Sequence, residues 1–416
     1  MGLSAVLPLL LKDRGASFSD LGVFSLNSWP FSLKLLWAPI VDTVYLRSFG
    51  RRKSWMVPAQ LLIGLTLLCL SSSIESLLDG ERPAIYTLTA VFFFLFFLCA
   101  TQDIAVDGWA LTMLQKENVG YAATCNSVGQ TLGYALGFTG FMTLEHLKVL
   151  TLPTCFFFWG IAFIVVTFGV ALLKHEKPLP IEDEPEDVLT SYKHMLAIVK
   201  LKVVRSLILV LCTWKFSFAV LDGVAPLKFQ EYGIPKEHMA YLATILMPVY
   251  ILLPMVISRH TAGPAPLDVA LRAYPVRVAL VPLTAIALSY FPERLVPTPW
   301  GFYAAIFLLS LVGAVASQSM FVAQMAFFAK VSDPAMGGTY MTLLNTLANL
   351  GGMWPPTVAM FLVDRTTCLD ATCTIRRDGF YVVAAVSTAA GVAWYVLLAR
   401  FTRDLQRAKE EAWKVR

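Results

Sequence analysis

Long apolar stretches, each followed by a short polar segment, recur along almost the whole chain. A helix of roughly 20 apolar residues is long enough to cross the hydrocarbon core of a bilayer. The pattern therefore predicts eleven spanning helices, at about 18–45, 54–75, 84–114, 119–143, 151–174, 203–224, 237–259, 268–290, 299–328, 336–363 and 379–401. Residues 1–11 are also apolar but reach only about 16 Å as a helix, so we expect them to be the end of an incomplete first helix.

Composition supports a membrane protein. Hydrophobic residues make up 57% of the 416 positions, mean hydropathy is +0.65, and only 15% of residues are charged, which is too few for a soluble surface. The loops on one side hold about twice as many Lys and Arg residues as the other loops. We count Arg272 and Arg277 with the richer side and Lys228 with the poorer side. The positive-inside rule places the richer side, with the C-terminus, in the cytosol, and the net charge of +5 requires no nucleic acid.

Two halves are predicted. The longest polar connection is acidic and contains three prolines, which is typical of a linker. The predicted division is an N-terminal six-helix half at 1–174, a cytoplasmic linker at 175–202, a second six-helix half at 203–401 and a cytoplasmic tail at 402–416. A constant offset supports a duplication, because it overlays three pairs of small or polar residues: Asn126 on Asn345, Gln130 on Asn349, and Gly133 on Gly352.

Several ionisable residues fall inside predicted spans, where an unpaired charge costs several kcal/mol. They are Lys34, Asp103, Asp107, Lys215 and Asp222. We predict that Lys34 and Lys215 attract phosphate groups of an anionic substrate near the middle of the membrane, with Asn126, Gln130, Asn345 and Asn349 donating and accepting hydrogen bonds. The three aspartates are candidates for charge pairing or proton coupling. An alternative is that Lys34 and Asp103 simply pair and fix two helices together.

A basic loop follows the span at 18–45. Asp42 is followed by Gly50, Arg51, Arg52 and Lys53. This order resembles the Asp-x-x-Gly-Arg-Arg/Lys loop between helices 2 and 3 of the major facilitator superfamily, although the gap between Asp42 and Gly50 is longer here. The resemblance implies the all-α fold of that superfamily, with two six-helix halves. We expect these five residues to form a gating loop on the cytoplasmic face.

Longer blocks carry a more specific resemblance. They are WPFSLKLLWAPIVDTVYLRSFGRRKSWMVP, ATQDIAVDGWALTMLQKENVGYAATCNSVGQTLGY, HTAGPAPL and AKVSDPAMGGTYMTLLNTLANLGGMWPPTVAMFLVD. Together they resemble the acetyl-coenzyme A transporters of the endoplasmic reticulum. The resemblance implies a multi-pass solute carrier that moves acetyl-coenzyme A from the cytosol into the lumen by alternating access, where the acetyl groups serve lumenal acetylation. Acetyl-coenzyme A or coenzyme A is then the substrate, and no cofactor is expected.

Two alternatives stay open at this point. The fold also suits a major facilitator carrier of another organic anion or of a muropeptide-like solute. The acetyl-coenzyme A transporters carry a cytoplasmic N-terminal tail and a whole first helix, which we do not find in this sequence. A transport-inactive truncated isoform is therefore a further hypothesis. Trp37 and Trp354 could stack on the adenine of the substrate, but tryptophan also commonly packs within helix bundles.

The remaining chemistry argues against an enzyme. All five histidines fall in predicted loops or at helix ends, so no general base is expected inside the bundle. Cys368 and Cys373 lie in the last lumenal loop, where an oxidising compartment would allow a disulfide between them, and no metal site is expected. No face of the chain defines an oligomeric state.

Overall fold

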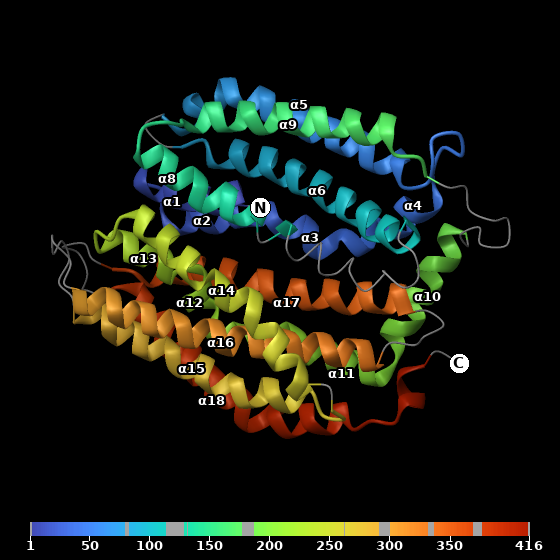
Figure 1. The fold of residues 1–416 in the computed structure, drawn as a ribbon. Helices are drawn as coiled ribbons and strands as arrows, with labels where there is room; N and C mark the ends of the chain where they lie inside the picture. Colours follow the sequence, from blue (N-terminus) through green and yellow to red (C-terminus); the bar gives the residue numbers. More distant parts are fainter. Residues whose placement is uncertain are drawn as a thin grey trace. The chain divides into compact units, whose positions relative to one another are not determined.

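The computed structural model describes residues 2–79, 83–113, 129–130, 132–176, 187–261, 263–290, 300–331, 337–368 and 377–414. These residues are almost entirely helical (Figure 1), and the one extended pairing among them is an isolated bridge between Cys368 and Arg377. They form two compact units. Unit 1 comprises Met1–Ala16 and Val23–Leu196, and unit 2 comprises Ser17–Gly22 and Ala197–Arg416. The boundary between the units falls inside the segment 175–202 that we expect to be the linker.

Unit 1 is built around two long helices that run side by side, α5 (Lys53–Leu78) and α9 (Leu152–Leu173). Glycines allow this close packing, because a Cβ at Gly160 would lie 3.0 Å from the carbonyl oxygen of Gly64. The unit also contains α1 (Gly2–Asp13), the long helix α6 (Ile85–Met113) and α8 (Phe141–His146), the last preceded by a π-helical turn, η4 (Ala135–Gly140).

The predicted span at 18–45 is not one continuous helix. It is divided into α2 (Phe18–Ser25), η1 (Leu26–Ser28), α3 (Trp29–Leu33), η2 (Lys34–Leu36) and α4 (Ala38–Thr43). Pro30 and Pro39 each lie in the first turn of a new helix, where the missing proline N–H is tolerated. Lys34 begins the 3-10 turn η2, so this lysine lies at a break in its helix.

Unit 2 contains the five long helices α14 (Lys236–Thr261), α15 (Leu267–Ser289), α16 (Trp300–Val331), α17 (Gly337–Thr366) and α18 (Gly379–Gln406). Helix α15 packs against both α16 and α18. A broken helix precedes them and consists of α11 (Lys202–Thr213), η6 (Trp214–Phe218), α12 (Ala219–Gly223) and α13 (Ala225–Glu231). Lys215 lies in the 3-10 turn η6, so Lys34 and Lys215 both lie at helix breaks.

Eight helical segments among the described residues are long and apolar enough to cross a membrane. Each coincides with a predicted span, and none of the spans at 18–45, 119–143 and 336–363 is among the eight. The first is divided into short helices, and the second lies partly outside the described residues, which begin again at 129. The third, α17, contains Asn345, Asn349 and several glycines that lower its hydropathy. The predicted linker contains a further helix, α10 (Val188–Lys200).

Candidate functional site

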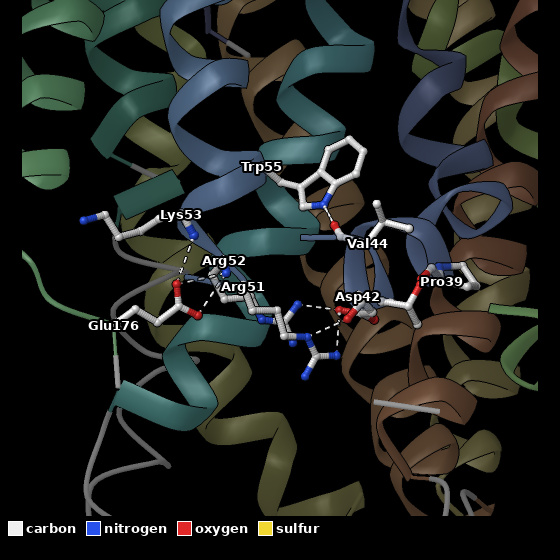
Figure 2. A network of polar contacts seen from close by, with 9 residues as sticks. Pro39, Asp42, Val44, Arg51, Arg52, Lys53, Trp55 and Glu176 are labelled. Carbon is white, nitrogen blue, oxygen red and sulfur yellow. Dashed lines mark hydrogen bonds and ion pairs between the residues drawn. The ribbon is translucent and has the colours of Figure 1, made fainter. Parts of the chain in front are cut away.

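The start of α5 brings together four of the five residues of the predicted gating loop (Figure 2): Asp42, Arg51, Arg52 and Lys53. The Arg52 guanidinium pairs with the Asp42 carboxylate, and Arg51 Nε donates a 2.6 Å hydrogen bond to the backbone oxygen of Asp42. Arg51 Nη2 lies 3.6 Å from Asp42 Oδ1. Burial and the neighbouring Arg52 lower the pKa of Arg51, while the Asp42 carboxylate opposes that shift. Asp42 therefore still meets the two arginines, although the gap between Asp42 and Gly50 is longer than in the superfamily motif.

Glu176 completes this network, and sequence reasoning missed it. Its carboxylate accepts hydrogen bonds from the backbone N–H groups of Arg52, at 2.9 Å, and Lys53, at 3.1 Å. These amides lie at the N-terminus of α5, where backbone donors have no partner within the helix and a negative charge is favoured. Its position directly after α9, in a segment we expected to be a solvated linker, was the available signal.

The Lys53 side chain caps the C-terminal end of α9. Its ammonium donates to the carbonyl oxygens of Ala171, at 2.8 Å, and Lys174, at 3.0 Å, at the C-terminal end of α9. A positive charge is favoured at that end of a helix. Helices α5 and α9 are thus each capped by a charged side chain that comes from, or closely follows, the other helix.

Lys34 and Asp103 form an ion pair within unit 1. Lys34 Nζ lies 2.7 Å from Asp103 Oδ2, and the two side chains are 13% and 27% exposed. The pair joins the break at η2 to α6. Trp37 lies one residue beyond η2, donates a 3.1 Å hydrogen bond to Thr101 Oγ1 and packs on Phe97. In the described structure, Trp37 therefore holds the broken helix against α6. Asp107 also belongs to α6, but its side chain is outside the described part of the structure.

Lys215 has a different environment in unit 2. Its Nζ donates a single long hydrogen bond, 3.4 Å, to the carbonyl oxygen of Ala348 in α17. The described residues provide no carboxylate within ion-pair distance of it. Gly352 makes room for the ammonium, since a Cβ there would lie 3.0 Å from Nζ. Trp354 lies beside this site, stacks on Phe216 and donates a 2.9 Å hydrogen bond to the carbonyl oxygen of Cys212, so it packs α17 against the broken helix.

Asp222 is paired, and its partner corrects a sequence prediction. We counted Arg277 with the cytoplasmic loops, but it lies in the middle of α15 and its side chain is only 7% exposed. Its Nη2 donates to both carboxylate oxygens of Asp222, at 2.7 and 2.5 Å. The signal was present, because Arg277 falls well inside the predicted span at 268–290. Lys228 is a second correction, since it lies buried in α13 and pairs with Glu231 and Asp378 rather than occupying a loop.

The predicted amide and cysteine positions are described unevenly. Asn345 in α17 has a buried side-chain oxygen with no hydrogen-bond partner among the described residues, whereas Asn349 and Gln130 are exposed. Asn126 lies outside the described residues. Cys368 is disulfide-bonded, and its predicted partner, Cys373, lies outside the described residues as well. The roles that we predict for the amides as substrate ligands stay predictions.

Comparison with known proteins places the chain in a family. The family model for acetyl-coenzyme A transporter 1 matches residues 1–187, 180–300 and 271–373. The chain belongs to the acetyl-coenzyme A transporter 1 family. An uncharacterised protein of Schizosaccharomyces pombe is 33% identical, over 98% of this chain and 84% of its own length. An uncharacterised membrane protein of Saccharomyces cerevisiae is 29% identical, over 98% of this chain and 93% of its own.

A solved structure supports the fold of this family member. The nucleoside transporter NupG, as a D323A mutant, superposes with a TM-score of 0.65 at 14% identity, covering 95% of each chain. The fold is therefore that of the major facilitator superfamily, as the sequence predicted. The chain is a multi-pass membrane transporter, and the family and the structural neighbours are transporters rather than enzymes.

Proposed function

We propose that this protein moves acetyl-coenzyme A from the cytosol into the lumen of the endoplasmic reticulum, with Lys215 as the anchor for the anionic part of the substrate. The observation that carries the proposal is the environment of Lys215. This lysine lies at a helix break within a membrane-spanning segment, and its one hydrogen bond in the described structure is to the carbonyl oxygen of Ala348.

An ammonium in this position is energetically costly unless something compensates its charge. A carboxylate compensates two other such charges in this protein, since Lys34 pairs with Asp103 and Arg277 pairs with Asp222. The phosphate groups of coenzyme A would supply the missing negative charge, because phosphate accepts charge-assisted hydrogen bonds from an ammonium. Membership of the acetyl-coenzyme A transporter 1 family supports this substrate class.

The helix break supports a binding role as well. In carriers of this kind, substrate sites are typically formed where a spanning helix is interrupted, because unwound backbone offers unpaired polar groups there. The 3-10 turn η6 provides such an interruption, and Trp354 and Phe216 stack on each other within reach of the same turn. These rings offer a flat apolar surface to the adenine portion of the substrate.

The test is uptake of radiolabelled acetyl-coenzyme A into proteoliposomes that contain the purified protein. Lys215→Ala and Lys215→Arg are compared with the wild type, and Lys330→Ala, which removes an exposed lysine at the end of α16, is the matched control. We expect Lys215→Ala to reduce uptake by at least about tenfold, Lys215→Arg to retain part of it, and the control to behave as the wild type. If uptake is unchanged in Lys215→Ala, Lys215 is not the substrate anchor. If the wild type is folded but takes up no acetyl-coenzyme A, another organic anion becomes the better candidate substrate.

A further inference from the structure

Arg277 is the most deeply buried charged group near Lys215. It lies in the middle of α15, within a segment that crosses the membrane, and its side chain is 7% exposed. An arginine at such a position is costly, so it is expected to have a specific partner and a function. Asp222, in α12, is that partner, and both of its carboxylate oxygens accept hydrogen bonds from Arg277 Nη2.

The guanidinium is also attached to the helix break that carries Lys215. The guanidinium carbon lies 4.4 Å from the centre of the Phe218 ring, which is a cation–π contact, and Phe218 is the last residue of η6. Ser217, the preceding residue of η6, shares a 2.6 Å hydrogen bond with the Tyr274 hydroxyl on α15. Two neighbouring residues of the break are therefore fastened to α15, close to Arg277.

These three charges act on one another. Lys215 and Asp222 belong to the same broken helix, seven residues apart, and Arg277 contacts that helix at both Asp222 and Phe218. The Asp222 side chain is 46% exposed, whereas the Arg277 side chain is 7% exposed, so the carboxylate is the more accessible of the two groups. Without Arg277, the Asp222 carboxylate would offset the charge of Lys215 and would repel an approaching anion. With Arg277 present, the group of Lys215, Asp222 and Arg277 has two positive charges and one negative charge, and the surplus is positive.

We propose that Arg277 is a specificity-determining residue of this carrier: by neutralising Asp222, it keeps the positive charge of Lys215 available to an anionic substrate. The proposal rests on the proposed function, because it concerns the same anion site. Arg277 acts through Asp222 and requires no contact with the substrate. It is accordingly a positioning residue, and its removal is expected to be corrected by also removing the charge of Asp222.

The test is a double-mutant cycle with Arg277→Gln, Asp222→Asn and the combined variant, using concentration-dependent uptake of acetyl-coenzyme A into proteoliposomes. We expect Arg277→Gln to raise the KM by about tenfold or more, because an uncompensated carboxylate faces the anion in a medium of low dielectric constant. The combined variant should return the KM to within about threefold of the wild type, since the Lys215 charge is again unopposed. A combined variant with a KM as high as that of Arg277→Gln would overturn the proposal.

A matched control separates this effect from the general loss of a buried ion pair. Lys228 and Asp378 form such a pair in the same unit, and Lys228 is also 7% exposed. We expect Lys228→Gln and Asp378→Asn to lower the melting temperature of the purified protein without shifting the KM. If these variants raise the KM as much as Arg277→Gln does, the electrostatic role of Arg277 is refuted.

A second readout does not depend on the identity of the transported substrate. Inorganic pyrophosphate serves as a simple anionic probe, and its binding is measured as protection of the purified protein against heat. We expect protection in the wild type and in the combined variant, and at least about tenfold weaker protection in Arg277→Gln. If the wild type takes up no acetyl-coenzyme A, the proposed function fails while this pattern still supports the role of Arg277. Equal protection of the wild type and Arg277→Gln would overturn that role, whatever the substrate is.

Discussion

The Glu176 carboxylate accepts a hydrogen bond from the backbone N–H of Lys53, and the Lys53 ammonium in turn donates to carbonyl oxygens at the end of α9, the helix that Glu176 follows. This exchange satisfies backbone groups that neither helix can satisfy alone. It also ties the start of α5 and the end of α9 to the loop that holds Asp42; Figure 2 shows Glu176, Arg52 and Asp42 in this network. A loop that a sequence motif marks as a gate is thus fixed at one side by a residue outside the motif.

The first prediction concerns this cap. Replacing Glu176 with Ala should destabilise unit 1 by about 1–2 kcal/mol, because two backbone donors at the start of α5 lose a charged acceptor. Glu176→Gln should cost less, since an amide oxygen can still accept one hydrogen bond. Thermal unfolding of the purified protein measures both effects. Glu75→Gln, on an exposed face of α5, is the control and should leave the melting temperature unchanged.

The second prediction separates two reasons for the glycine at position 50. Gly50 has a φ of +103°, and a Cβ there would lie 2.4 Å from Glu176 Oε2. Gly15 has a φ of +83° with nothing within 4 Å of such a Cβ. Gly15→Ala should therefore cost only the backbone strain of about 1 kcal/mol, whereas Gly50→Ala should cost clearly more and should disturb the Glu176 cap. Similar melting temperatures for the two variants would show that the contact with Glu176 is unimportant.

The third prediction concerns the ion pair of Lys34 and Asp103. Lys34→Met leaves the Asp103 carboxylate without its partner inside the membrane and should destabilise the protein by about 3 kcal/mol. The combined variant Lys34→Met with Asp103→Leu should be more stable than that single variant, because no unpaired charge is left. Melting temperatures of the two single variants and the combined variant give the coupling. If the combined variant still transports, the pair fixes helices together; if it is stable but inactive, the pair takes part in the transport cycle.

The fourth prediction uses two adjacent glycines of α17. A Cβ at Gly352 would meet the Lys215 ammonium at 3.0 Å, which the flexible end of a lysine can avoid by moving. A Cβ at Gly351 would lie 2.1 Å from the carbonyl oxygen of Leu211, a backbone atom that cannot move so easily. Gly352→Ala should therefore yield a folded protein with a raised KM for the anionic substrate. Gly351→Ala should reduce the yield of folded protein, as judged by size-exclusion chromatography. A normal KM in Gly352→Ala would argue against the present position of Lys215 as a substrate contact.

Sequence reasoning correctly identified the class of protein. The ion pair of Lys34 and Asp103 was one of two readings of the sequence, and the structure places these residues 2.7 Å apart. It failed at Arg277, because counting basic residues as a topology signal assigned this arginine to a loop although it lies inside α15. It failed at Glu176 because this residue is one of several acidic residues in the predicted linker, and its spacing in the sequence does not distinguish it from the others. Both residues act through partners far away in the chain.

Apolar run length by itself determined that this chain is a helical membrane protein, because hydrocarbon thickness sets the helix length and leaves few alternatives. The transporter family came from the resemblance of long sequence blocks, and the family model confirms it. Only the tertiary structure decided which charges are compensated. Lys34 and Lys215 look alike in the sequence, because each is a lysine in an apolar run that also contains tryptophan and phenylalanine. One has a carboxylate at 2.7 Å and the other has a single backbone carbonyl at 3.4 Å. Electrostatic interactions inside a membrane depend on distances of a few ångströms between helices, and such distances arise only when the helices pack.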